Sequence, residues 1–151
     1  MIAFETNVRI DRPVEEVFAY VSEPLNFPRW NSAVESMRKT SAGEEGVGSR
    51  YVMERELPTG HAINELDVVA SEPPREFAIR ATTGPTPFLY RYRFAAANGE
   101  TIVHLDAEVE LPGPAGLLRQ LGRRAVRNGV DQNLATLKQI LEATPGRSHL
   151  G

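Results

Sequence analysis

Two sets of polar side chains in this sequence stand at spacings that could support chemistry. The first set, His104, Asp106 and Glu108, alternates with apolar residues and so shares one face of a predicted strand, with about 6–7 Å between neighbours. Such a stripe has the groups needed to bind a metal ion or to act as acid and base. Because apolar residues alternate with it, we expect it to be the solvated face of a sheet, with no metal bound.

The second set falls in register with the apolar residues of other predicted strands. It comprises Arg55 and Asn64, with the phenols of Tyr51, Tyr90 and Tyr92. Buried polar groups need hydrogen-bond partners, so these side chains fit poorly in a dry core. An apolar hollow with a few convergent polar groups is typical of a small-molecule pocket. We therefore predict an internal cavity. The alternative is that the polar ends reach water at the sheet edge or pair with the backbone.

Motifs for other kinds of catalysis and for cofactors are missing. His61, His104 and His149 do not have the spacing of metal ligands. The absence of cysteine excludes disulfides, thiolate chemistry and cysteine-bound iron–sulfur clusters. The glycines of segment 43–48 lack the lysine and the strand-to-helix setting of a phosphate-binding loop. We expect no cofactor.

The overall composition narrows the range of partners. Lys plus Arg number 17 and Asp plus Glu number 20, and the net charge of −3 argues against nucleic acid as the main partner. We expect no membrane span and no signal peptide, and hence a cytoplasmic protein. We expect the protein to be a monomer or a homodimer. The long helix is locally basic at Arg119, Arg123, Arg124, Arg127 and Lys138, which are expected to form a solvated helix face. Attraction to an anionic membrane or to an acidic ligand group is the alternative.

Hydrophobic periodicity predicts a mixture of helices and strands. Residues 2–10 alternate as a strand with one buried face, and residues 14–21 show helical spacing. The segment 22–31 contains two prolines, which forbid a long helix there. This segment nevertheless carries Phe27 and Trp30, and so must pack its apolar groups onto something.

A series of strands and one long helix complete the chain. Asn98-Gly99 between alternating runs is the strongest hairpin signal in the sequence. Short connections of this kind favour antiparallel neighbours. A helical pattern then extends to about Glu142 and contains Gly122 and Gly129, which indicate a bend, a close contact or mere tolerance. The predicted strands are 34–40, 48–57, 61–71, 75–83, 87–97 and 100–111.

Four short motifs carry a resemblance to a known family. They are Ile-Asp-Arg-Pro-Val-Glu-Glu-Val-Phe at 10–18, Pro-Arg-Trp-Asn at 28–31, Gly-Val-Gly at 46–48 and Glu-Pro-Pro-Arg at 72–75. Together they resemble the START-like superfamily, also called SRPBCC, and in particular its bacterial polyketide cyclase/dehydrase and lipid-transport branch. The motifs are structural, so they specify a fold better than a function.

The element order and the resemblance imply the same architecture. Helices this few must cover one face of the sheet, which is an α+β layer plan. We expect a helix-grip fold, in which a seven-stranded curved antiparallel sheet wraps around a long C-terminal helix and two short helices follow strand 1. A single ligand-binding domain is expected over residues 1–143, followed by a disordered tail over 144–151.

Three functions remain open at this point. The first is binding or transport of a hydrophobic small molecule, such as a lipid, polyketide or isoprenoid. The second, implied by the resemblance, is a polyketide cyclase or dehydratase-like enzyme in which Arg55 and the cavity tyrosines steer enolate chemistry. The third is an interaction module that acts through the segment from Phe27 to Trp30 or through the long helix.

The inward phases of the predicted strands and helix define a set of candidate ligand-binding residues. No catalytic residue is assigned. The candidates are Phe27, Trp30, Tyr51, Met53, Arg55, Asn64, Leu66, Phe77, Ile79, Tyr90, Tyr92, Leu121 and Ala125.

Overall fold

The computed structural model describes residues 1–57, 60–111 and 117–143, without the side chains of 117–120. The predicted tail, 144–151, lies outside these residues. The elements in chain order are β1 (Ile2–Ile10), α1 (Val14–Val21), the 3₁₀ helix η1 (Pro24–Asn26), α2 (Phe27–Trp30), β2 (Val34–Lys39), β3 (Arg50–Leu57), β4 (Gly60–Glu72), β5 (Glu76–Ala81), β6 (Phe88–Ala97), β7 (Glu100–Val109) and α3 (Leu117–Ala143).

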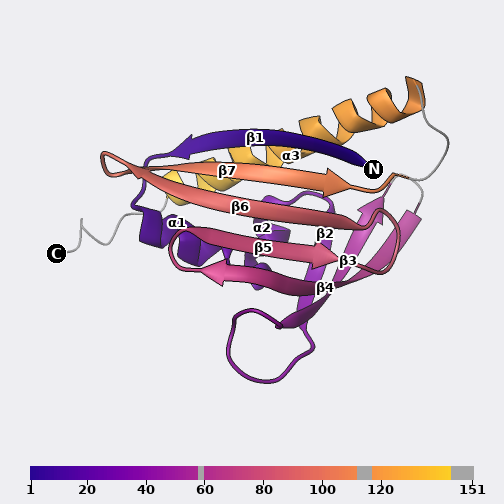
Figure 1. Ribbon diagram of the computed structural model, residues 1–151, viewed down its shortest axis with the longest axis horizontal. Helices are drawn as coiled ribbons and strands as arrows, with labels where there is room; N and C mark the ends of the chain where they lie inside the picture. Colours follow the sequence, from indigo (N-terminus) through magenta and orange to yellow (C-terminus); the bar gives the residue numbers. More distant parts are fainter. Residues whose placement is uncertain (58–59, 112–116, 144–151) are drawn as a thin grey trace.

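The strands form one antiparallel sheet in the order β1-β7-β6-β5-β4-β3-β2. Strands β2 to β7 follow one another as neighbours, while β1 crosses to pair with β7 along its whole length. The helices lie on one side of this curved sheet (Figure 1). The predicted helix-grip fold is therefore confirmed.

The hairpin between β6 and β7 shows how local sequence sets the register. Asn98 and Gly99 both have positive φ, at 54° and 81°. Two positive φ values in a two-residue loop match the twist of the flanking strands, and asparagine and glycine tolerate them best. Ala97 consequently pairs with Glu100, and the ladder continues to Phe88 opposite Val109.

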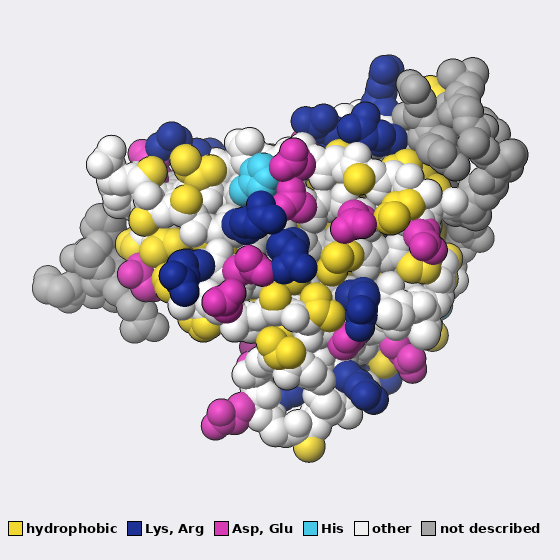
Figure 2. Space-filling view, in the orientation of Figure 1, with side chains coloured by type: hydrophobic (Ala, Val, Ile, Leu, Met, Phe, Trp, Pro, Cys, Tyr) yellow, Lys and Arg dark blue, Asp and Glu magenta, His cyan; other side chains and the backbone are white. Residues whose placement is uncertain are grey.

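The predicted phases of the strands are also correct. Phe77, Ile79 and Leu105 are almost fully buried on the inner face. The outer face carries ion pairs such as Arg80–Asp67 at 3.1 Å. Figure 2 shows basic and acidic side chains interleaved over this face. Surface pairs of this kind contribute little stability, so the inner face holds the fold together.

The predicted strand ends are wrong by two residues at three places. The strand expected over 48–57 begins at Arg50. The strand expected over 75–83 ends at Ala81, and the strand expected over 100–111 ends at Val109. After Ala81 the chain turns through Gly84, whose φ is +82°. Prolines at 85 and 87 have no amide hydrogen for a sheet ladder. The loop 82–87 that results contacts Arg55, a residue that lines the cavity described below.

Helix α3 is the long helix of the fold, about 40 Å from end to end. Its C-terminal half packs on the sheet through Val130, Leu134, Leu137 and Leu141, which are all buried. Its N-terminal half projects beyond the sheet (Figure 1). In the described part of the chain, no helix is long and apolar enough to cross a bilayer.

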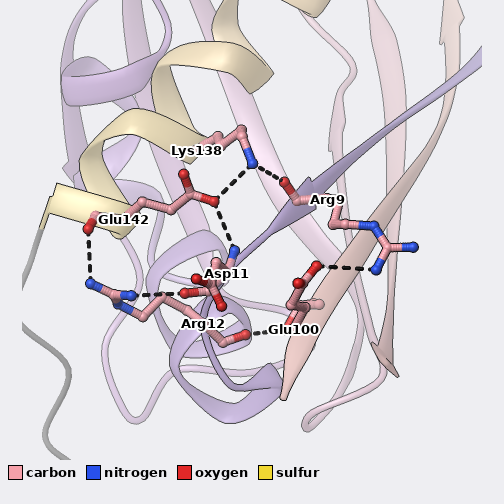
Figure 3. Close-up of polar contacts among 7 residues, drawn as sticks. Arg9, Asp11, Arg12, Glu100, Lys138 and Glu142 are labelled. Atoms are coloured by element: carbon pink, nitrogen blue, oxygen red, sulfur yellow. Dashed lines mark hydrogen bonds and ion pairs between the residues drawn. The ribbon is translucent and has the colours of Figure 1, made fainter. Parts of the chain in front are cut away.

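A cluster of polar contacts fixes the C-terminal end of α3 to the end of β1 (Figure 3). Lys138 Nζ donates to the carbonyl of Arg9 at 2.6 Å and to Glu142 Oε2 at 2.8 Å. The same Glu142 oxygen accepts from the amide of Asp11 at 2.8 Å, and Arg12 donates to the Glu142 carbonyl at 2.9 Å. These contacts bind helix and sheet together at one end, so the other end can diverge.

The segment between α1 and β2 turns its aromatic residues inward. Phe27 and Trp30 are each 4% exposed, and their rings meet edge to face at 5.4 Å. Trp30 makes a second edge contact with Tyr92 of β6 at 6.2 Å. The two residues therefore pack against the sheet and do not present their rings to a partner protein.

Candidate functional site

An apolar cavity of about 190 Å³ lies between α2, the middle of α3 and the inner face of the sheet. Aromatic rings from α2 and β6 form much of its wall. The lining residues are Phe27, Trp30, Asn31, Ala33, Val34, Met53, Arg55, Phe88, Tyr90, Tyr92, Val126, Gly129, Val130 and Asn133.

The structure brings together Phe27, Trp30, Met53, Arg55, Tyr90 and Tyr92 from the candidate set. Sequence reasoning missed the part of the lining that α3 supplies. Val126, Gly129, Val130 and Asn133 stand at the i, i+3, i+4, i+7 spacing of one helix face, which was the signal available.

The other candidates lie elsewhere. Phe77, Ile79 and Leu66 are packed in the core. On α3, Leu121 is 53% exposed and Ala125 is also exposed, because this part of the helix projects beyond the sheet.

Tyr51 lies away from the cavity, although it is buried as predicted. It is fully buried, and its hydroxyl donates to Glu45 in the loop between β2 and β3. Burial and this carboxylate raise the pKa of Tyr51 well above its ordinary value. The phenol is therefore a structural donor that fastens the loop.

A larger hollow of about 390 Å³ borders the charged residues Arg50, Glu65, Asp67 and Arg80 on β3, β4 and β5. These residues belong to the solvated face, where Arg80 and Asp67 already pair with each other. The smaller cavity is the better candidate site, because it combines apolar walls with a cationic group that has no charged partner.

Arg55 of β3 is that cationic group. Its Nε donates to Asn64 Oδ1 at 2.9 Å, and its Nη2 donates to the Pro85 carbonyl at 2.7 Å and to Thr86 Oγ1 at 2.6 Å. All of these acceptors are neutral. Burial lowers the pKa of the guanidinium, and the nearby Tyr90 opposes this effect. An arginine nevertheless stays charged in proteins, so the cavity wall holds a positive charge.

Asn64 and the loop 82–87 hold Arg55 in place. Asn64 is fully buried, and its Nδ2 donates to the carbonyls of Thr83 at 2.5 Å and Pro85 at 3.1 Å. This arrangement requires glycine at position 84, because a Cβ there would lie 2.3 Å from the Ile63 carbonyl oxygen and 2.7 Å from Asn64 Nδ2. Asn64 therefore lies behind the cavity wall and positions a residue that lines it.

The cavity tyrosines are poor acids. Burial raises the pKa of Tyr90 to about 12, although the Arg55 charge opposes the shift. Burial also raises the pKa of Tyr92 well above its usual range. Both phenols keep their protons near neutral pH and can donate hydrogen bonds. The described cavity lining contains no aspartate, glutamate or histidine that could remove a proton from a ligand.

Two groups of potential metal ligands lie away from the cavity, on the sheet. Glu5 of β1 joins His104 and Asp106, with His104 Nε2 at 3.0 Å and 3.3 Å from the two carboxylates. The predicted stripe thus lies on the outer face, as expected. A second group, formed by Glu35, Glu56 and His61, is exposed, and its members also pair with one another.

The sequence matches a family described as polyketide cyclase/dehydrase and lipid transport, over residues 1–142. The chain belongs to this family. The description of the family names both polyketide cyclases or dehydrases and lipid transport. Membership therefore indicates a role with hydrophobic small molecules, and it fits an enzyme and a carrier equally well.

Solved structures similar to this family member show the same fold. A START superfamily protein from Mycobacterium smegmatis has a TM-score of 0.76 at 16% identity, covering 93% of this chain and 97% of that one. The di-domain ARO/CYC StfQ from the steffimycin biosynthetic pathway has a TM-score of 0.74 at 14% identity, covering 91% of this chain and 49% of that one. At these identities the likeness shows the START-like fold alone.

One curated protein is similar in sequence. The cytochrome P450 monooxygenase ppzE of Metarhizium majus (strain ARSEF 297) is 29% identical over 116 residues, which are 75% of this chain and 24% of that protein. The chain thus spans about a quarter of the length of this relative.

Proposed function

We propose that this protein binds and carries a hydrophobic small molecule in the cavity between α2, α3 and the sheet. The observation that supports this most is the unfilled volume of about 190 Å³ inside an otherwise closely packed fold. Protein interiors are normally packed with few voids larger than water, so an apolar hollow of this size supports a binding site. Family membership supports the same class of ligand.

Trp30 provides a direct test, because it lines the cavity and is the single tryptophan of the chain. Its fluorescence should change in a saturable way when 4-ethylbenzamide, 4-ethylbenzoate or laurate is added to the purified protein. Native mass spectrometry should also detect an apolar molecule that copurifies. If no compound alters the fluorescence and the protein purifies empty, the carrier function is refuted.

A cyclase or dehydratase is the second candidate, favoured by the presence of Arg55, Tyr90 and Tyr92 in one cavity. Arg55 could stabilise an enolate oxygen, and a phenol could donate a proton. The raised pKa of both tyrosines suits donation and opposes proton removal. Binding is preferred, because the described lining offers no general base. If Arg55→Ala and Tyr92→Phe leave the turnover of every accepted polyketide unchanged, these catalytic roles fail.

A further inference from the structure

The positive charge of Arg55 has no carboxylate partner among the residues that the structure describes. Its hydrogen bonds all go to neutral oxygens, on Asn64, Pro85 and Thr86. No ion pair among the described residues includes it, and segments 58–59, 112–120 and 144–151 contain no aspartate or glutamate. A half-buried charge in an apolar wall is costly unless an opposite charge reaches it.

The contacts of Arg55 leave one side of its guanidinium available. Nε and Nη2 are held by the buried Asn64 and by the loop 82–87, whereas Nη1 donates to no described residue. Because Asn64 is itself fixed by two carbonyls, the guanidinium is held before any ligand arrives. A preorganised charged donor of this kind selects an anionic oxygen over a neutral one.

Trp30 supplies a second and independent sign of a missing oxygen. The residue is 4% exposed and lines the cavity, and its Nε1 is buried with no hydrogen-bond partner among the described residues. A buried donor without an acceptor costs about 1–3 kcal/mol. Trp30 comes from α2 and Arg55 from β3, so two residues from different elements line one apolar space, and each has a donor without a partner among the described residues.

The size of the cavity limits the rest of the ligand. An engineered apolar cavity of about 150 Å³ takes up benzene. A volume of about 190 Å³ therefore suits one ring with a small substituent better than a long acyl chain. The rings of Phe27, Phe88 and Tyr92 in the wall suit an aromatic body, because offset and edge contacts add to the area that is buried.

From these observations we infer that the ligand is a compact organic anion, with a carboxylate or similarly acidic oxygen bound by Arg55 and Trp30 and a body of about one ring. This inference rests on the proposed carrier function and specifies its ligand. A bound anion would balance the otherwise unpaired guanidinium and offer an acceptor to the tryptophan.

Calorimetric titration of the whole chain at about pH 7.5 tests the inference with two compounds of the same shape. We expect ionised 4-ethylbenzoate to bind about 10- to 100-fold more tightly than neutral 4-ethylbenzamide, the range that a charge-assisted hydrogen bond supports. Arg55→Met should remove this preference, so that the two compounds bind with similar affinity and the loss is larger for 4-ethylbenzoate than for 4-ethylbenzamide. Arg80→Met, which removes the same charge from the outer face, should change neither affinity.

The outcomes separate the inference from the function on which it rests. If the wild-type protein binds 4-ethylbenzoate no more tightly than 4-ethylbenzamide, the inference of an anionic ligand is overturned. This comparison does not require Arg55→Met to fold. If the protein binds laurate but neither ring compound, the inference of a ligand body of about one ring is overturned and the carrier function stands. Failure of every compound to bind, in a protein that also purifies without an apolar molecule, refutes the carrier function itself. Trp30→Phe should weaken 4-ethylbenzoate about fivefold and 4-ethylbenzamide by less, because it removes a donor to the anionic oxygen.

Discussion

Gly129 offers the sharpest test of the cavity, because it is a helical glycine whose missing side chain leaves open space. It lies within α3 and lines the cavity, and a Cβ built on it would meet no atom within 4 Å. Glycine inside a helix costs about 1 kcal/mol relative to alanine. The position is thus unfavourable for the helix but keeps the cavity open.

Two substitutions at this position should separate stability from binding. Gly129→Ala should stabilise the protein by about 1 kcal/mol, which raises the melting temperature by about 2–4 °C for a chain of this length. Gly129→Leu should place an apolar side chain in a volume of about 190 Å³, which is little more than one ring requires. We expect it to fold at least as stably as the wild type and to bind 4-ethylbenzoate at least about 10-fold more weakly.

Gly122 provides the matched control on the same helix. Its Cβ would lie 2.6 Å from Leu111 Cδ1, the end of a flexible side chain, and it does not line the cavity. Gly122→Ala should therefore gain less stability than Gly129→Ala and leave ligand affinity unchanged. Thermal unfolding by circular dichroism and titration calorimetry measure the two quantities. A lower melting temperature for Gly129→Ala, or unchanged affinity in Gly129→Leu, would refute the reasoning.

Three further predictions concern the supports of the site. Gly84→Ala should destabilise the protein by about 2–4 kcal/mol in urea unfolding, because the positive φ and a clash with backbone act together. Gly43 has a positive φ (+94°) but open space around it, so Gly43→Ala should cost about 1–2 kcal/mol. Equal losses in the two variants would contradict the clash at Gly84. The pKa of Glu142 is held low in the folded protein, chiefly by Lys138 and then by the Asp11 amide. The contribution of Glu142 to the free energy of unfolding is therefore present above its unfolded pKa and is lost as the pH falls through its folded pKa. Glu142→Gln should lower the melting temperature by about 1–2 °C at pH 7 and not at all at pH 2, and a deficit at both values would contradict this linkage. The ionisation of Tyr90 can be measured by ultraviolet titration, as the difference between the wild type and Tyr90→Phe. Tyr90 should ionise near pH 12, and at a higher pH in Arg55→Met, because that variant lacks the charge that opposes the shift. Ionisation near its ordinary value of about 10 would contradict its burial.

The strands and their faces could be predicted because their signals are local. Alternation of apolar residues determined which side of β5, β6 and β7 is buried, and turn residues such as Asn98 and Gly99 marked the hairpins. The ends of β5 were misplaced, because alternation in the sequence continues to Thr83 although the loop through Gly84 has left the ladder.

The helical wall of the cavity could not be located in the same way. Apolar residues recur along the whole of α3, so the pattern identifies a buried stripe without saying which turn lies opposite α2. Leu121 and Ala125 are exposed, whereas Val126 and Val130, each five residues further along the helix, lie at the cavity. The contacts of Lys138 and Glu142 with the end of β1 set that position, and they join residues far apart in the chain.

The sequence by itself determined a curved antiparallel sheet with a long helix, and it singled out Arg55 and the tyrosines as misfits in a dry core. Only the tertiary structure decided what surrounds them. Neutral backbone carbonyls around Arg55 come from the loop 82–87, and backbone acceptors leave no mark on residue type. Likewise, the unpaired Nε1 of Trp30 depends on which elements close around α2. Periodicity records which face of an element is buried, whereas a binding site depends on how distant elements meet.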